Sequence, residues 1–165
     1  MAREYSVLLV EDEVIVALDI ELTVAAAGLR VDAHAVRGSE ALELFERHRP
    51  DLCLVDLQLL DGPVGIDCGR RFAKAGALVV FMTANHRALP EDLCGACGVI
   101  AKPYTNAGLL AALDYLRRRL AGEALPEQVP AALELFAPAL AGPDEVPADL
   151  LRQPPSALHG RPGTI

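Results

Sequence analysis

Short apolar runs, each closed by a polar residue, recur along the first two thirds of this chain. The runs YSVLLV (5–10), LCLVD (52–56) and ALVVFMT (77–83) are apolar at almost every position. A strand that is buried on both faces needs apolar residues throughout, so these runs predict parallel strands. Segments with helical spacing separate the runs, and that alternation predicts helices on both faces of one sheet.

The order of these segments predicts five β–α units over residues 1–121. Strands are expected at 5–10, 29–36, 52–56, 77–83 and 99–101, and helices at 14–28, 40–48, 66–76, near 87–95 and at 106–120. Gly28 and Pro50 are typical of the residues at which helices end. The predicted fold is α/β, with a doubly wound, five-stranded parallel sheet.

Polar residues stand where the predicted strands end. They are Glu11, Asp12, Asp56, Thr83 and Lys102. Parallel strands end at one rim of a sheet, and open α/β sheets bind ligands there, so we expect these side chains to form one site. Three carboxylates this close repel one another, and a hard divalent cation with oxygen ligands relieves the repulsion. Mg²⁺ is the expected cation.

The predicted site has the groups of a phospho-aspartate pocket. A cation held by Asp12 and Asp56 would neutralise charge while a phosphoryl group moves onto an Asp56 oxygen, which makes Asp56 the expected nucleophile. The Thr83 hydroxyl and the Lys102 ammonium can donate hydrogen bonds to the phosphoryl oxygens. Each residue alone also fits an ordinary strand-end or surface role, and only the ordered set favours the pocket.

Four stretches of text carry a resemblance to a known family. They are VLLVEDE (7–13), DLCLVDLQLLDG (51–62), VVFMTAN (79–85) and VIAKPY (99–104). Over roughly residues 5–120 the chain resembles the receiver domain of bacterial two-component response regulators. The resemblance implies a flavodoxin-like (βα)5 fold. FMTAN followed by KPY is similar to the single-domain regulators of alphaproteobacteria that carry an FATGY-like motif.

The resemblance also implies roles for the site residues. Asp12 and Asp56 would bind Mg²⁺ directly, the main-chain carbonyl of Gln58 would be the third contact, and Glu11 would act through water. Asp56 would be the phosphoacceptor, with Thr83 and Lys102 contacting the phosphoryl group. The family's peptide bond at the position of Lys102-Pro103 is usually cis.

The function implied is phosphorelay signal transduction. A histidine kinase or phosphotransfer protein would phosphorylate Asp56, and the output would be contact with an unidentified downstream protein. A phosphate sink for a shared kinase and a phosphorylation-independent adaptor stay open as alternatives. We expect no enzyme activity beyond self-phosphorylation and slow self-dephosphorylation, because haloacid-dehalogenase-like phosphatases need a second aspartate where Gln58 stands.

One position departs from the usual family pattern. Many receivers switch through an aromatic residue three positions before the lysine, and Val99 stands there. We therefore expect the signal to pass through the loop after Thr83 to a face formed by the helix near 87–95, the strand at 99–101 and the helix at 106–120. Pairing of two copies through that face or through the tail stays open.

Composition excludes several other classes of protein. The net charge of −8 disfavours a nucleic-acid partner. No apolar run reaches the roughly 18 residues that cross a bilayer and MAREYSV has no leader pattern, so we expect a cytoplasmic protein without membrane insertion. Cys94 and Cys97 form a C-x-x-C, but the other two cysteines lack the spacing that would complete a zinc site.

Residues 122–165 form a Pro-rich extension that holds eight of the chain's 12 prolines. Prolines at this density prevent long regular elements, and we expect one short helix near 130–141 with Leu133, Phe136 and Leu140 on one face. Two alternatives remain open. The extension is disordered, or its segment LELFAPAL packs as an amphipathic helix on its own receiver, a second copy or a partner.

Overall fold

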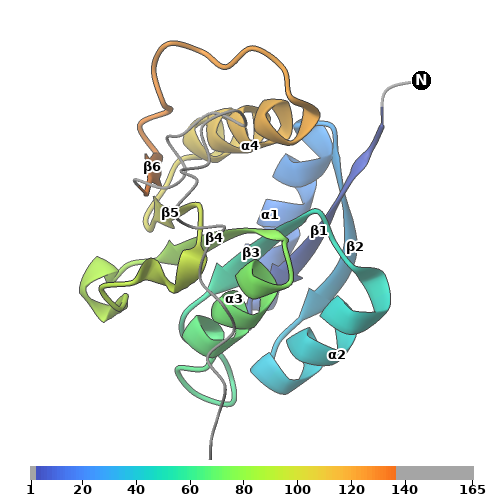
Figure 1. The fold of residues 1–165 in the computed structure, drawn as a ribbon, viewed down its shortest axis with the longest axis vertical. Helices are drawn as coiled ribbons and strands as arrows, with labels where there is room; N and C mark the ends of the chain where they lie inside the picture. The colour runs from blue at the N-terminus through green and yellow to red at the C-terminus, as the bar shows by residue number, and fades with distance from the viewer. Residues whose placement is uncertain (1–2, 137–165) are drawn as a thin grey trace, which may run out of the picture.

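The computed structural model describes residues 3–136 and arranges them around one sheet (Figure 1). The strands are β1 (Tyr5–Val10), β2 (Leu29–Ala35), β3 (Leu52–Asp56), β4 (Leu78–Thr83), β5 (Gly98–Ala101) and β6 (Leu133–Leu135). The helices are α1 (Val14–Ala26), α2 (Gly38–His48), α3 (Gly65–Lys74) and α4 (Asn106–Ala121). The predicted alternation of strands and helices is confirmed in the first three units and in the fifth, where α4 follows β5.

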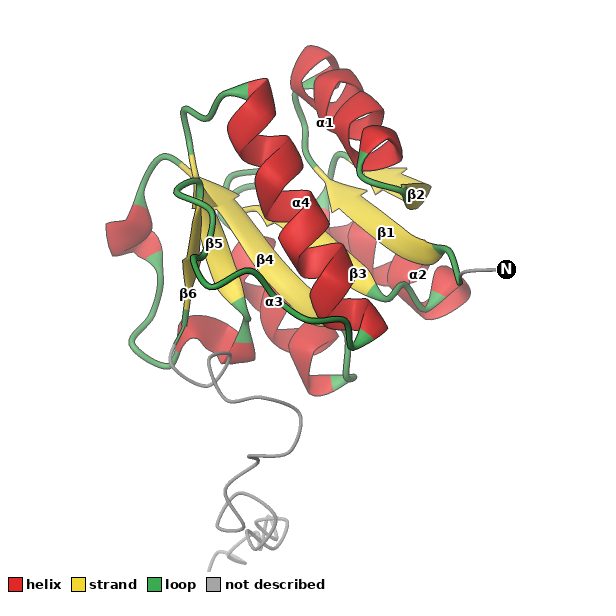
Figure 2. Ribbon diagram, turned by 90° about the horizontal axis from the view of Figure 1, so that it is seen from above, coloured by secondary structure: helices red, strands yellow, loops and turns green. Residues whose placement is uncertain are grey.

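The sheet has the order β2-β1-β3-β4-β5-β6. Strands β1 to β5 run parallel, as predicted, and β6 pairs antiparallel with β5. Helices α1 and α4 cover one face, and α2 and α3 cover the other (Figure 2). The order reverses between β1 and β3, which is the place where doubly wound sheets bind ligands.

Alternate residues of each central strand enter two separate cores. In β1, Val7 and Leu9 pack with α1 and α4, whereas Leu8 and Val10 pack with α2 and α3. All four side chains are fully buried. This two-sided burial explains why the strands are continuous apolar runs. It also fixes the position along each strand at which the first polar residue emerges from the core.

The segment between β4 and β5 differs from the prediction. We expected a helix near 87–95, and the structure has two short 3₁₀ turns, His86–Ala88 and Leu93–Gly95. Pro90 lies between them and has no N–H for a helical hydrogen bond. Leu93 and Cys94 have φ values of 50° and 57°, which a right-handed helix does not allow. The chain therefore crosses from β4 to β5 without an α-helix.

The predicted helix near 130–141 is wrong where the structure describes it, because residues 133–135 form strand β6. The N–H and C=O groups along the edge of β5 need partners, and this segment pairs with them. Leu133 and Phe136 are both buried, at 4% and 7% exposure. The segment thus packs on its own receiver, but as a strand. Residues 137–141 of the prediction, with Leu140, lie outside the described residues.

Candidate functional site

The acidic residues predicted for the site meet at the rim of the sheet. Glu11 and Asp12 directly follow β1, and Asp56 is the last residue of β3. One carboxylate oxygen from each lies within 4.8 Å of the others. Because β1 and β3 are neighbours and diverge toward helices on opposite faces, the rim is open at this point.

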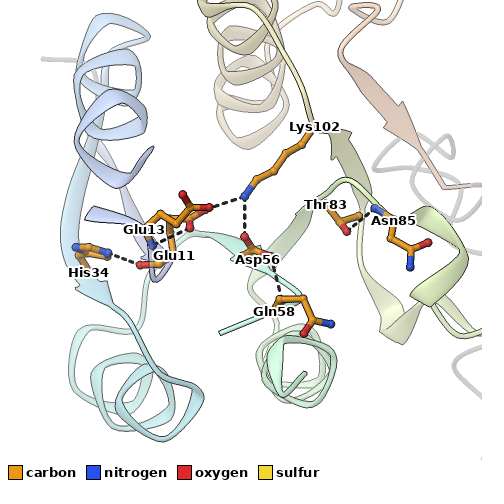
Figure 3. A network of polar contacts seen from close by, with 8 residues as sticks. All are labelled: Glu11, Glu13, His34, Asp56, Gln58, Thr83, Asn85 and Lys102. Carbon is orange, nitrogen blue, oxygen red and sulfur yellow. Dashed lines mark hydrogen bonds and ion pairs between the residues drawn. The ribbon is translucent and has the colours of Figure 1, made fainter. Parts of the chain in front are cut away.

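Lys102 brings the positive charge to this cluster from the end of β5. Its Nζ lies 2.6 Å from Asp56 Oδ2 and 2.9 Å from Glu11 Oε2 (Figure 3). The Lys102-Pro103 bond is cis, as the resemblance implies. One ammonium cannot balance three carboxylates, so the rim keeps an excess of negative charge.

Burial sets the electrostatics of the Glu11–Lys102 pair. The Glu11 side chain is 1% exposed, and this loss of solvent raises the pKa of its carboxyl, partly opposed by hydrogen bonds from the Glu13 N–H and from Lys102. Burial alone would lower the pKa of Lys102, but its hydrogen bonds to Asp56 and Glu11 outweigh that effect and the pKa is raised. Lys102 therefore stays charged at neutral pH.

Backbone contacts orient the acids, and the sequence did not indicate them. The Glu13 N–H donates to Glu11 Oε1 at 3.0 Å, and the Gln58 N–H donates to Asp56 Oδ1 at 3.0 Å. His34 Nε2 lies 2.8 Å from the Glu11 carbonyl oxygen (Figure 3). His34 follows from no motif, because only the pairing of β1 with β2 brings it to this position.

Thr83 ends β4 next to the acids. It is 5% exposed, and its Oγ1 accepts a hydrogen bond from the Asn85 N–H at 3.0 Å. Thr83 also joins two parts of the site, because its carbonyl accepts a hydrogen bond from the Lys102 N–H at 2.9 Å. The structure thus brings Thr83 and Lys102 together with the acids. The catalytic and metal-binding roles of these residues stay predictions.

Val99 does not reach the surface as an aromatic switch residue would. It is 1% exposed and pairs across the sheet with Glu134 of β6. Its side chain packs in the same core as Phe81 and Phe136. Val99 is therefore part of the core, and the outer edge of β5 is covered by β6.

The donors at the rim fit a magnesium ion. Mg²⁺ prefers carboxylate and carbonyl oxygens and is usually held by one or two carboxylates together with water. Glu11, Asp12 and Asp56 offer such oxygens at close range, and the only neighbouring cation described for them is Lys102. The cluster also matches the magnesium site that the resemblance to receiver domains implies.

Comparison with known proteins agrees with the fold and the rim. The family model of the response regulator receiver domain matches residues 7–114. The phyllosphere-induced regulator PhyR of Methylorubrum extorquens is 35% identical over 117 residues, which make up 69% of this chain and 43% of that protein. The chain spans about half the length of the curated relatives it matches.

Solved structures show the same architecture. The PhyR response regulator REC domain of Erythrobacter litoralis has a TM-score of 0.62 at 26% identity and covers 76% of this chain and 97% of that chain. The anti-anti-sigma factor PhyR of Bartonella quintana has a TM-score of 0.55 at 27% identity, over 74% of this chain and 51% of that chain.

A doubly wound sheet with an acidic cluster at its switch point, contacted by a lysine from the end of β5, fits the class of receiver-like α/β domains. The chain belongs to the response regulator receiver domain family of two-component systems. It is therefore a domain of phosphorelay signalling. None of the helices within residues 3–136 is long and apolar enough to cross a membrane.

Proposed function

We propose that the protein accepts a phosphoryl group on Asp56 from a histidine kinase or phosphotransfer protein, with Mg²⁺, and signals by contact with another protein. The contact between Lys102 Nζ and Asp56 Oδ2, at 2.6 Å inside a cluster of three carboxylates, carries this proposal. Lys102 contacts both Asp56 and Glu11, and of these two acids Asp56 is the more exposed, at 13% against 1%, so it is the one that a phosphodonor can reach.

The residues divide the work of the transfer. An Asp56 oxygen forms the new P–O bond while the bond from phosphorus to the donor breaks. Asp12, Asp56 and the Gln58 carbonyl would hold Mg²⁺, with Glu11 acting through water, and the bound ion supplies positive charge to the phosphoryl oxygens. Lys102 and the Thr83 hydroxyl would donate hydrogen bonds to the phosphoryl group once it is on Asp56.

The proposed output is protein contact. The Bartonella quintana relative is named as an anti-anti-sigma factor, and that name describes an action on other proteins. The net charge of −8 disfavours a nucleic-acid target. We expect no catalysis beyond self-phosphorylation and slow self-dephosphorylation, since the amide of Gln58 cannot act as a general acid or base where a phosphatase would use a second aspartate.

Intact-mass measurement with a small phosphodonor tests the proposal. Wild type should gain one phosphoryl group only when Mg²⁺ is present, and Asp56→Asn should gain none. Glu46→Gln is the control, because Glu46 is an exposed acid in the last turn of α2, at the end of the helix opposite the rim. Wild type that stays unlabelled, or Asp56→Asn that labels like wild type, would remove Asp56 as the phosphoacceptor.

A further inference from the structure

Strand β6 occupies the outer edge of β5. Leu133, Glu134 and Leu135 pair antiparallel with Ile100, Val99 and Gly98. The Phe136 N–H continues the pairing by donating to the Cys97 carbonyl at 2.9 Å. Figure 2 shows β6 alongside β5, on the side of the sheet away from β2. An edge that would otherwise present free N–H and C=O groups is thus covered by the chain itself.

The sequence of β5 is adapted to a strand at this edge. A Cβ atom on Gly98 would lie 2.4 Å from the Glu134 carbonyl oxygen, so only glycine permits the approach of β6. Val99 is small, and both Val99 and Phe136 are buried in the same core. The edge of β5 therefore has the shape of a surface that receives an extended segment.

The cover itself is lightly held. Strand β6 has three residues, at the short end of the usual range for a strand. Residues 122–132, which join it to α4 and are all described, contain no helix or strand (Figure 1). The gain from burying Leu133 and Phe136 must offset the entropy lost in ordering that whole connection. Removing β6 also leaves the five parallel strands intact, so the cover can open without unfolding the domain.

Two short connections join this edge to the phosphorylation site. β5 runs directly into Lys102, whose Nζ contacts Asp56. From Thr83, the chain passes through Asn85 to His86, whose Nδ1 lies 3.5 Å from Glu134 Oε2 of β6. A phosphoryl group on Asp56 would draw the Lys102 ammonium and the Thr83 hydroxyl toward its oxygens. Both connections between the site and the edge of β5 would then shift.

We propose that the edge of β5 is a binding surface for an extended segment of a partner protein, and that β6 occupies this surface until Asp56 is phosphorylated. The inference rests on the proposed function, since phosphorylation is the trigger. The chemistry of β6 describes the segment that fits: an antiparallel strand with the pattern apolar, acidic, apolar, aromatic, as in LELF (133–136). Main-chain hydrogen bonds would provide affinity, and the pockets of Leu133 and Phe136 would provide specificity.

Hydrogen exchange on the full chain tests the opening of β6. Wild type is treated with the small phosphodonor and Mg²⁺, intact mass reports the adduct, and exchange is followed in residues 130–136. We expect faster exchange in this segment of the phosphorylated protein and no change in Asp56→Asn. An adduct without faster exchange would overturn this inference and leave the proposed function standing, whereas no adduct would overturn both.

A labelled peptide with the sequence of residues 130–136 tests the binding surface. It should bind phosphorylated wild type at least about tenfold more tightly than unphosphorylated wild type. Phe136→Asp and, separately, Leu133→Asp should bind it without phosphorylation, because a buried charge expels β6. The control Val129→Asp changes an exposed residue of the same connection and should behave like wild type.

Two results would reject the surface. The first is a pair of folded β6 variants, verified by circular dichroism, that bind the peptide no better than Val129→Asp. The second is dimerisation of phosphorylated wild type by exchange of β6, measured by light scattering. The segment that binds the edge of β5 would then come from a second copy of this chain and not from a partner protein.

Discussion

The rim that carries Asp56 and the edge that carries β6 belong to one sheet but differ in how firmly their residues are held in place. At the rim, the acids stand directly after residues 7–10 and 52–55, which are fully buried, and backbone N–H groups orient Glu11 and Asp56. At the edge, three residues at the end of an irregular connection cover β5. A phosphorelay switch needs both: a site that keeps its geometry, and a surface that changes at small cost.

Truncating one phenylalanine of the core that supports the rim and one of the edge should show the largest difference. Phe72→Ala removes a fully buried ring that stacks on Phe45 at 4.4 Å, and should lower the free energy of unfolding by about 3–5 kcal/mol. Phe136→Ala should lower it by only about 1 kcal/mol, since the loss cannot exceed what holds β6 in place. Urea unfolding of both variants measures the contrast, and equal losses would mean that β6 belongs to the cooperative core.

Adding one methyl group to a glycine in each region gives a second contrast. A Cβ on Gly65 would lie 2.0 Å from the Asp56 carbonyl oxygen, and Gly98 faces a similar clash of 2.4 Å with Glu134. Gly65→Ala should lower the free energy of unfolding by about 2–4 kcal/mol, because neither backbone can move out of the core. Gly98→Ala should cost less than about 1 kcal/mol, because β6 can leave.

Hydrogen exchange distinguishes the two glycine variants independently of the unfolding energies. In Gly98→Ala, fast exchange should be confined to residues 133–136, with β1 and β3 protected as in wild type. Fast exchange in β3 of this variant would contradict the picture of a detachable edge.

Magnesium should stabilise the rim and leave the edge unaffected. At ten times its dissociation constant, Mg²⁺ should raise the free energy of unfolding of wild type by about 1.4 kcal/mol. Asp12→Asn should lose this gain, because Asp12 supplies one of the clustered oxygens. Phe136→Ala, with an intact rim, should keep it. Thermal unfolding with and without the ion measures the effect, and a full gain in Asp12→Asn would move the site elsewhere.

A pH effect at Asp61 should be the smallest of the four. Asp61 accepts hydrogen bonds from the Gly38 and Ser39 N–H groups at the start of α2, and these bonds lower the pKa of its carboxyl. A pKa lower in the folded than in the unfolded state stabilises the fold above about pH 3.9 and loses that stabilisation as the pH falls further. Asp61→Asn should therefore be less stable than wild type at pH 7, with a narrowing difference below pH 4.

The control for this titration is Asp67→Asn, which changes another exposed acid of the same part of the chain. The difference between the urea midpoints of this variant and of wild type should be the same at pH 7 as below pH 4. If the difference in stability between Asp61→Asn and wild type is the same at pH 7 and below pH 4, the charge of Asp61 contributes nothing to the stability of the fold.

Five strands, four helices and the meeting of the rim residues could be predicted from the sequence. Continuous apolar runs admit one arrangement when both faces of a strand are buried, so Glu11, Asp56 and Lys102 could be placed at one rim before any coordinates. The contact of His34 with Glu11 could not be predicted, because it depends on the register of β2 against β1.

The errors fall in segments whose local pattern is weak. Between β4 and β5, the composition suggested a helix, but Pro90 lacks the N–H for a helical hydrogen bond and Leu93 and Cys94 have a left-handed backbone. At residues 133–136, the spacing of Leu133 and Phe136 suits one side of a helix, and the structure buries both of them along a strand instead.

The sequence by itself determined which polar residues meet at the rim, because the burial of the strands and the order of the elements follow from local patterns. Only the tertiary structure decided that the chain covers its own β5. The free hydrogen-bonding groups of an edge strand are satisfied by whichever segment lies beside them, and that segment is chosen by its position in space rather than by its own preference.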